Sequence, residues 1–280
     1  MRSFLLTAVL TAVMAAPAVA QNEPNAREAY VERRGLLEID ARCQVLTSTI
    51  RDALNVSVTQ ARGSLLRAGW SNAQMRELDS AIVSAARQRA CNDARTAASV
   101  SSVSSTVAQW ANAGTMEFPG WDRAWVARRT AEGWRISQSI GAPLDATFGV
   151  RQIGDTQRLT LTIPVARGET APRSASIVMR DPSRARAEVS LNQRIANGLE
   201  AGLPSPAFAR TIPATRSIEQ LANGRSQAVF TFADTTFRDL LALDPRESVE
   251  LRVQNGRAAQ SLLVEVGDIG AARAFLTIRR

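Results

Sequence analysis

The sequence predicts an α+β protein, in which an N-terminal helical bundle precedes an antiparallel, sandwich-like β-rich domain with a short C-terminal helix. Up to Gly114, apolar residues recur every three or four positions, which is typical of amphipathic helices. After Gly114 they fall in short runs separated by turn residues, as in an antiparallel sandwich or a curved sheet. The expected division is a signal peptide at 1–20, a helical domain at 21–114 and a β-rich domain at 115–280.

The first twenty residues are typical of a secretory signal peptide. A positive charge at Arg2 precedes an apolar run over residues 4–16, and Ala18-Val19-Ala20 is a small-x-small cleavage signal. The apolar run has 13 residues, whereas a membrane-spanning helix needs about 20. We therefore expect cleavage after Ala20 and a mature chain, 21–280, that is periplasmic or secreted and has no transmembrane segment.

Two cysteines, Cys43 and Cys91, are expected to form a disulfide, because an exported chain with an even number of cysteines usually pairs them. A redox-active pair and two unpaired thiols are the alternatives. Cys91 lies off the apolar stripe of the third predicted helix. Either that helix bends, or Cys43 approaches it from a second neighbouring helix.

Four helices are predicted in the first half. The first covers about residues 26–54, and its apolar stripe is formed by Leu36, Ile39, Cys43, Leu46, Ile50 and Ala53. A shorter helix follows, and Gly69 can end it in a left-handed conformation. Ser71 and Gln74 fit a capping box that opens the third helix. Valine spacing within residues 93–113 favours a fourth helix over a Ser-rich linker.

Short strands are predicted in the second half. The expected strands are 125–127 and 134–140, 147–152 and 158–165, 174–180, 188–191, 228–232, and 249–253 and 259–266. Asn255-Gly256 is a tight-turn signal between the last two. We expect Asp234 to cap a short helix and Asp268 a terminal one. Residues 192–225 are expected to be loop with some helix, and to be the mobile or ligand-facing segment.

All 34 basic residues are arginine, since the chain contains neither Lys nor His, and the formal net charge is +8. Codon usage in a GC-rich genome is one explanation. The other is that arginine forks bind carboxylates or phosphates in two-point contacts. The arginines form no dense run, so a dedicated nucleic-acid function is not expected.

The missing residue types exclude several catalytic chemistries. Without His there is no Ser-His-Asp triad, and without Lys there is no Walker loop or Schiff base. Two cysteines without His cannot complete a four-ligand zinc site. We therefore expect no enzyme, no cofactor and no metal. Carboxylate chemistry remains possible, so a glycan hydrolase with two facing acids is the enzymatic alternative.

Tryptophans and arginines gather at the junction of the two halves. Trp and Arg dominate binding hot spots, so this cluster is a candidate recognition surface. The alternative is that the tryptophans form core and seal the two halves together. The candidate residues are Trp121, Arg123, Trp125, Arg128, Arg129 and Trp134.

The last fifty residues resemble the C-terminal portion of bacterial secreted proteins of the invasion-associated locus B type. The resemblance rests on the order of apolar segments, from Phe230 to Asp234, Phe237 to Leu241, Val249 to Val253 and Gly267 to Leu276. It implies an exported β-rich protein with an envelope or host-facing role. The cysteines of that family's β-domain are absent here, since no Cys follows Cys91.

These observations predict an exported, non-catalytic binding protein. Its expected partner is another envelope protein or an anionic component of the cell wall or membrane. The helical half would supply the docking face, and the arginines would steer the partner electrostatically. A third alternative, an assembly or chaperone-like factor, predicts an exposed apolar groove on the helical half.

Overall fold

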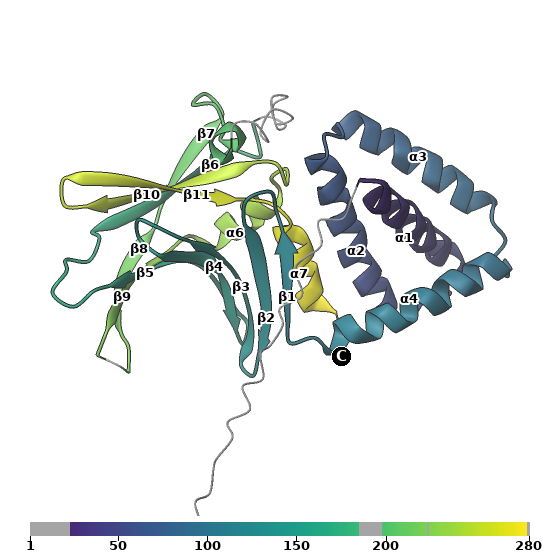
Figure 1. Cartoon of the computed structure of the whole chain (residues 1–280), viewed down its shortest axis with the longest axis horizontal. Coiled ribbons are helices and arrows are strands. Elements are labelled where there is room, and N and C mark those ends of the chain that lie inside the picture. The colour runs from purple at the N-terminus through teal and green to yellow at the C-terminus, as the bar shows by residue number, and fades with distance from the viewer. Residues whose placement is uncertain (1–22, 185–197, 223, 279–280) are drawn as a thin grey trace, which may run out of the picture.

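A computed structural model describes residues 23–184, 198–222 and 224–278, and the fold is α+β (Figure 1). The helices are α1 (Glu23–Cys43), α2 (Ser48–Arg67), α3 (Asn72–Gln88), α4 (Ala94–Asn112), α6 (Asp234–Leu241) and α7 (Ile269–Thr277), with a 3₁₀ turn, η2, at Leu199–Gly202. The strands are β1 (Thr115–Pro119), β2 (Ala124–Thr130), β3 (Gly133–Ile140), β4 (Ala146–Ile153), β5 (Thr156–Val165), β6 (Ser174–Arg180), β7 (Ala209–Pro213), β8 (Thr215–Gln220), β9 (Ser226–Thr231), β10 (Ser248–Asn255) and β11 (Ala258–Glu265).

The strands form two antiparallel sheets. One has seven strands in the order β1-β2-β3-β4-β5-β9-β8, and the other has four in the order β11-β10-β6-β7. The hairpins predicted around residues 131–133, Gly154-Asp155 and Asn255-Gly256 are confirmed. Alternating burial along β3 and β5 shows that each strand turns one face to the core.

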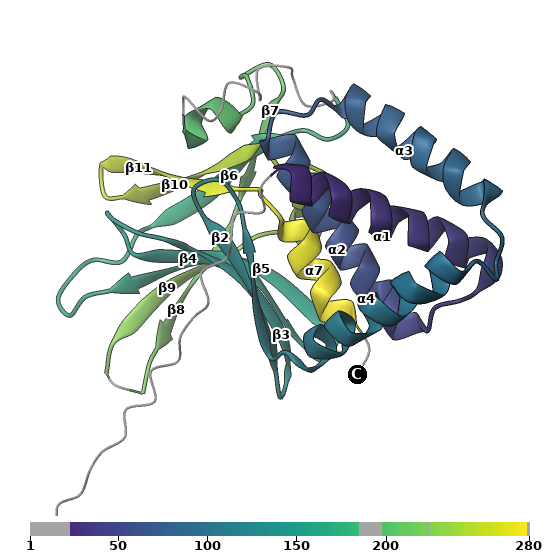
Figure 2. The same ribbon diagram turned by 45° about the vertical axis from the view of Figure 1, so that its right-hand side comes forward.

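Helix α7 joins the two halves of the molecule. It packs against α2 on one side and against β1, β2 and β3 on the other (Figure 2). Its buried side chains share one apolar cluster with Val56 of α2 and Trp125 of β2, and they are Ile269, Ala271, Ala272 and Phe275. The division into domains at residue 114 stays a prediction.

The single helix expected over residues 26–54 is wrong, because the chain turns between α1 and α2. Gln44 has a φ of 52°, outside the helical region. The buried carboxylate of Asp40 accepts hydrogen bonds from the Leu46 amide at 2.8 Å and from Arg51 Nε at 2.5 Å. Thr47 then caps α2. These polar contacts fix a tight turn that an apolar stripe does not reveal.

Other helix ends follow their predicted signals in part. Gly69 has a φ of 99° after α2, and Ser71 and Gln74 form the capping box of α3, so both predictions are confirmed. Asp234 was expected as a cap but is the first residue of α6, after Ala233. Asp268 occupies the N-cap position of α7 without a side-chain capping bond, because its carboxylate binds Arg67 instead.

The segment at 192–225 contains more regular structure than expected. Besides the 3₁₀ turn η2 it holds strands β7 and β8, which extend the two sheets. Strand β1 was also not predicted. The strand expected at 188–191, part of the 192–225 segment and the signal peptide lie outside the described residues.

Cys43 and Cys91 form a disulfide, with their Cα atoms 5.5 Å apart. Cys43 is the last residue of α1, and Cys91 lies in the turn between α3 and α4. The off-stripe position of Cys91 is thus explained, because α3 has already ended at Gln88.

Loss of this disulfide, by reduction or by the double substitution Cys43→Ser/Cys91→Ser, should lower the free energy of unfolding by about 3 kcal/mol. The bond spans 48 positions and restricts the unfolded chain. Urea unfolding with and without dithiothreitol measures the effect, and the double variant should not respond to the reductant. Equal midpoints for the oxidised and reduced protein would contradict this expectation.

Candidate functional site

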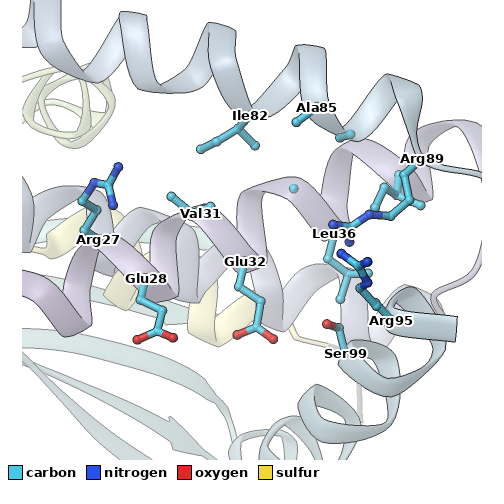
Figure 3. Close-up of a pocket in the computed structure, with 13 residues that line it drawn as sticks. Arg27, Glu28, Val31, Glu32, Leu36, Ile82, Ala85, Arg89, Arg95 and Ser99 are labelled. Atoms are coloured by element: carbon cyan, nitrogen blue, oxygen red, sulfur yellow. The ribbon is translucent and has the colours of Figure 1, made fainter. Parts of the chain in front are cut away.

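Helices α1, α3 and α4 line a cavity of about 910 Å³, here named the helical groove (Figure 3). Its floor is apolar and comes from α1 and α3, while its rim is polar. The floor consists of Val31, Gly35, Leu36, Ile39, Ile82, Ala85 and Ala86, and the rim of Arg27, Glu28, Glu32, Arg89, Arg95 and Ser99. A cavity of 300–1,000 Å³ with an apolar lining and a few polar groups is typical of ligand sites.

Helical periodicity places these side chains together. On α1 the lining positions include 28, 31, 32, 35, 36 and 39, which share one side of a helix, and positions 82, 85, 86 and 89 continue this pattern along α3 and just beyond it. Gly35 lies within the floor of α1. A Cβ atom there would lie 3.6 Å from Cγ2 of Ile82, which is ordinary van der Waals contact, so α1 and α3 approach each other closely at this point of the floor.

One end of the groove carries a concentration of positive charge. Figure 3 shows the side chains of Arg89 and Arg95 at this end, next to Ser99. Within the described part of the chain, neither guanidinium has a hydrogen-bond or ion-pair partner. Glu28 and Glu32 lie toward the amino end of α1, so the two ends of the groove differ in charge.

Several contacts hold this positively charged end in place. The Cys43–Cys91 disulfide ties the end of α1 to the turn that follows Arg89. Arg42 donates to the carbonyl oxygens of Ala86 and Arg89 at the end of α3. Asp93 caps α4 by accepting from the Arg95 amide at 2.8 Å. The backbone that carries Arg89 and Arg95 is therefore fixed by three sets of contacts: the disulfide, the Arg42 hydrogen bonds and the Asp93 cap.

The tryptophans and arginines predicted as a recognition surface do not share one surface. Trp125 is fully buried, and its Nε1 donates to the carbonyl oxygens of Glu265 and Val266 at 3.0 and 2.8 Å. Trp134 is also buried, with Arg273 lying 4.7 Å from its ring centre. Burial removes both rings from contact with a partner.

The arginines of this set have separate surroundings. Arg129 donates to the Ala113 and Phe275 carbonyl oxygens at 2.6 and 2.7 Å, so it links the end of α4 and α7 to the sheet. Arg128, the next residue on β2, is exposed on the opposite face, since strand side chains alternate. Trp121 and Arg123 are half-buried in the β1–β2 turn. A binding role for Trp121, Arg123 and Arg128 stays a prediction.

Sequence reasoning named Leu36 and Ile39 only as part of an apolar stripe, and it expected an apolar groove on the helical half only for an assembly or chaperone-like factor. The glycine within α1, Gly35, was a further signal that it did not use. Neither signal indicates by itself that three helices enclose a cavity. Whether a cavity forms depends on how far α3 and α4 diverge, and tertiary packing determines this separation.

The described residues contain no group of three or more His, Cys, Asp or Glu side chains that could hold a metal ion. Among the helices of the described part, none is long and apolar enough to cross a membrane.

Glu28 and Glu32 are the two acids in the helical groove, and both are exposed on one helix. A glycosidase uses two acids that face each other across a cleft, whereas these two lie on the same helix.

Comparisons of this chain with family models, with curated proteins and with solved structures find no match. The resemblance of the last fifty residues to secreted proteins of the invasion-associated locus B type therefore stays a prediction.

Proposed function

We propose that this protein is an exported binding protein whose helical groove holds an anionic amphiphile, a molecule with an apolar chain and a carboxylate or phosphate head. The observation that carries the proposal is the groove itself, with its apolar floor and, at one end, two arginines whose guanidinium groups have no partner among the described residues. It would act as a carrier or receptor for a membrane component rather than as an enzyme.

The floor is suited to a hydrocarbon chain. Val31 and Ala85 expose carbon surface without hydrogen-bonding groups, and the buried side chains of Leu36 and Ile82 lie beneath them. Each buried methylene of a ligand contributes about 0.8 kcal/mol. A chain of ten or more carbons in this floor would thus be held with useful affinity, even after the cost of association.

The charged rim orients the ligand. Arg89 and Arg95 can form two-point contacts with a carboxylate or a phosphate, and Ser99 adds a hydroxyl donor. Glu28 and Glu32 would repel an anionic head placed at their end of the groove, where Arg27 offsets only one of the two charges. The head is therefore expected beside Arg89 and Arg95.

The disulfide supports a site of action outside the cytoplasm, where such bonds persist. In the periplasm or outside the cell, fatty acids and phospholipid-derived molecules are the anionic amphiphiles of the surrounding membranes. The proposed location depends on export through the N-terminal signal, which protein sequencing of the mature N-terminus would test.

The groove predicts selective binding of tetradecanoate and tetradecyl phosphate over tetradecanol. Replacing Arg89 and Arg95 together by Gln should weaken binding of the two anions at least about tenfold, because the loss of even one charge-assisted contact of about 1.5 kcal/mol has an effect of this size. Binding of tetradecanol should be unchanged. Titration calorimetry below the critical micelle concentrations measures all three.

A matched pair of substitutions tests the location. Ala85→Trp places an indole in the floor and should abolish binding, whereas Ala73→Trp, also exposed on α3 but outside the groove, should leave it intact. Equal binding by the two variants would overturn the proposal. So would failure of every amphiphile to bind together with tight binding of an apolar helical peptide, which would assign the groove to a protein partner.

A further inference from the structure

Four arginines lie side by side across the outward face of the seven-stranded sheet. Arg128 of β2 pairs with Arg135 of β3, Arg135 pairs with Arg151 of β4, and Arg151 pairs with Arg158 of β5. All four are exposed. Neighbouring strands are about 4.8 Å apart, so this arginine row extends over about 14 Å.

The row is unfavourable for the protein on its own. Like charges directly opposite each other on adjacent strands destabilise a sheet. Partial burial, together with repulsion by Arg151 and Arg128, lowers the pKa of the Arg135 guanidinium. Across the described residues, no carboxylate forms an ion pair with any of the four. A bound anion would relieve this repulsion.

The face beside the row is rich in hydroxyl groups. A hollow of about 170 Å³ lies there, and its polar lining includes Thr147, Thr160, Thr162, Ser217 and Gln227. The outward positions of β2 to β5 contain no acidic residue. The one acid in the lining, Glu219 on β8, accepts a hydrogen bond from Gln227 at 2.7 Å.

Gly149 allows strands β3 and β4 to approach each other closely beside this hollow. It lies on β4 among the lining residues, and a Cβ atom there would approach the carbonyl oxygen of Ile136 to 2.1 Å. No side chain can be added at this position without moving β3.

We infer that this face binds an acidic polysaccharide, with carboxylates along the arginine row and sugar hydroxyls in the adjoining hollow. The row provides a line of guanidinium forks at regular spacing, which suits a chain that carries one acidic group on each successive unit. Threonine and serine hydroxyls can both donate to and accept from sugar hydroxyls. A bare polyphosphate would use the arginines but leave the hydroxyl groups without a partner.

Binding to polygalacturonate, dextran and polyphosphate tests the inference. At ~0.15 M salt, where exposed charges are screened beyond about 8 Å, the protein should bind polygalacturonate and not the neutral dextran. The double substitution Arg135→Gln/Arg151→Gln should weaken polygalacturonate binding at least about tenfold, because it removes the centre of the row. Since it also relieves like-charge repulsion, this variant should remain folded, as circular dichroism can verify.

The matched control is Arg167→Gln/Arg257→Gln, which removes the same charge from two exposed arginines away from this face and should bind as the unmodified protein does. Thr160→Val/Thr162→Val should weaken polygalacturonate binding several-fold without affecting polyphosphate. Equal losses for both arginine pairs would mean that net charge alone causes binding, and would overturn the inference. Polyphosphate binding as tight as that of polygalacturonate would overturn the polysaccharide assignment.

The outcome is independent of the helical groove. Ala85→Trp should bind polygalacturonate normally, because the groove and the arginine row lie on different elements. A protein that binds the polysaccharide and no amphiphile would retain this inference and refute the proposed function.

Discussion

Replacing Arg67 by Met should lower the free energy of unfolding by about 4 kcal/mol, because it leaves a buried carboxylate unpaired. Arg67 of α2 donates through Nη1 and Nη2 to the two carboxylate oxygens of Asp268, at 2.6 and 2.8 Å. Both side chains are buried, with 7% and 1% of their surface exposed. Water cannot replace the lost partner. Urea unfolding followed by circular dichroism measures the change.

A double substitution separates loss of the pair from loss of packing. Arg67→Met/Asp268→Leu removes both charges, so it should be more stable than Arg67→Met alone. The half-buried arginine Arg62, five residues earlier on α2, provides the control, because its Nη2 donates to the neutral side chain of Asn72 at 3.1 Å, and Arg62→Met should change stability by about 1 kcal/mol or less. If Arg67→Met proved as stable as Arg62→Met, the pair would not anchor α7 to α2.

Local signals predicted much of this fold. The capping box at Ser71 and Gln74, the left-handed Gly69 and the Asn255-Gly256 turn act within a few residues, so the sequence displays them directly. The hairpins followed from alternation and turn residues. The disulfide followed from counting cysteines in a chain that the sequence predicts to be exported.

Long-range pairing explains what could not be predicted. Arg67 and Asp268 are 201 positions apart, and nothing near either residue indicates the other. Strand β9 pairs with β5 and β8. The packing of the sheet determines this pairing, and the local sequence pattern does not. The arginine row was invisible for the same reason, since only the register brings Arg135, Arg151 and Arg158 beside the predicted Arg128.

The β1–β2 turn shows how a distant residue can determine a local structure. The buried Glu265 carboxylate at the end of β11 accepts hydrogen bonds from the amides of Trp121, Asp122 and Arg123, at 2.7, 3.0 and 3.0 Å. Three backbone donors thus stabilise one buried negative charge. Two residues predicted as binding residues, Trp121 and Arg123, owe their positions to this contact.

Glycine at position 120 is required by the same contact. A Cβ atom on Gly120 would lie 2.4–2.5 Å from the carboxyl atoms of Glu265. Gly120→Ala must therefore displace the turn or the carboxylate, and it should lower the free energy of unfolding by about 4 kcal/mol through lost charge-assisted hydrogen bonds. Denaturant unfolding, with hydrogen exchange at residues 121–123, measures both the loss and its location.

The same substitution at Gly114 provides the matched control. A Cβ atom there meets nothing within 4 Å, so Gly114→Ala should change stability by less than about 0.5 kcal/mol.

Glu265→Gln keeps the size of the side chain but directs an amide donor at backbone donors, and it should accelerate exchange at residues 121–123 with less loss of stability than Gly120→Ala. Because the Glu265 backbone oxygen also accepts from Trp125 and Gln138, through a group that Glu265→Gln leaves in place, the sheet itself should persist in this variant. Unchanged exchange in Glu265→Gln would show that the turn holds its shape without the carboxylate.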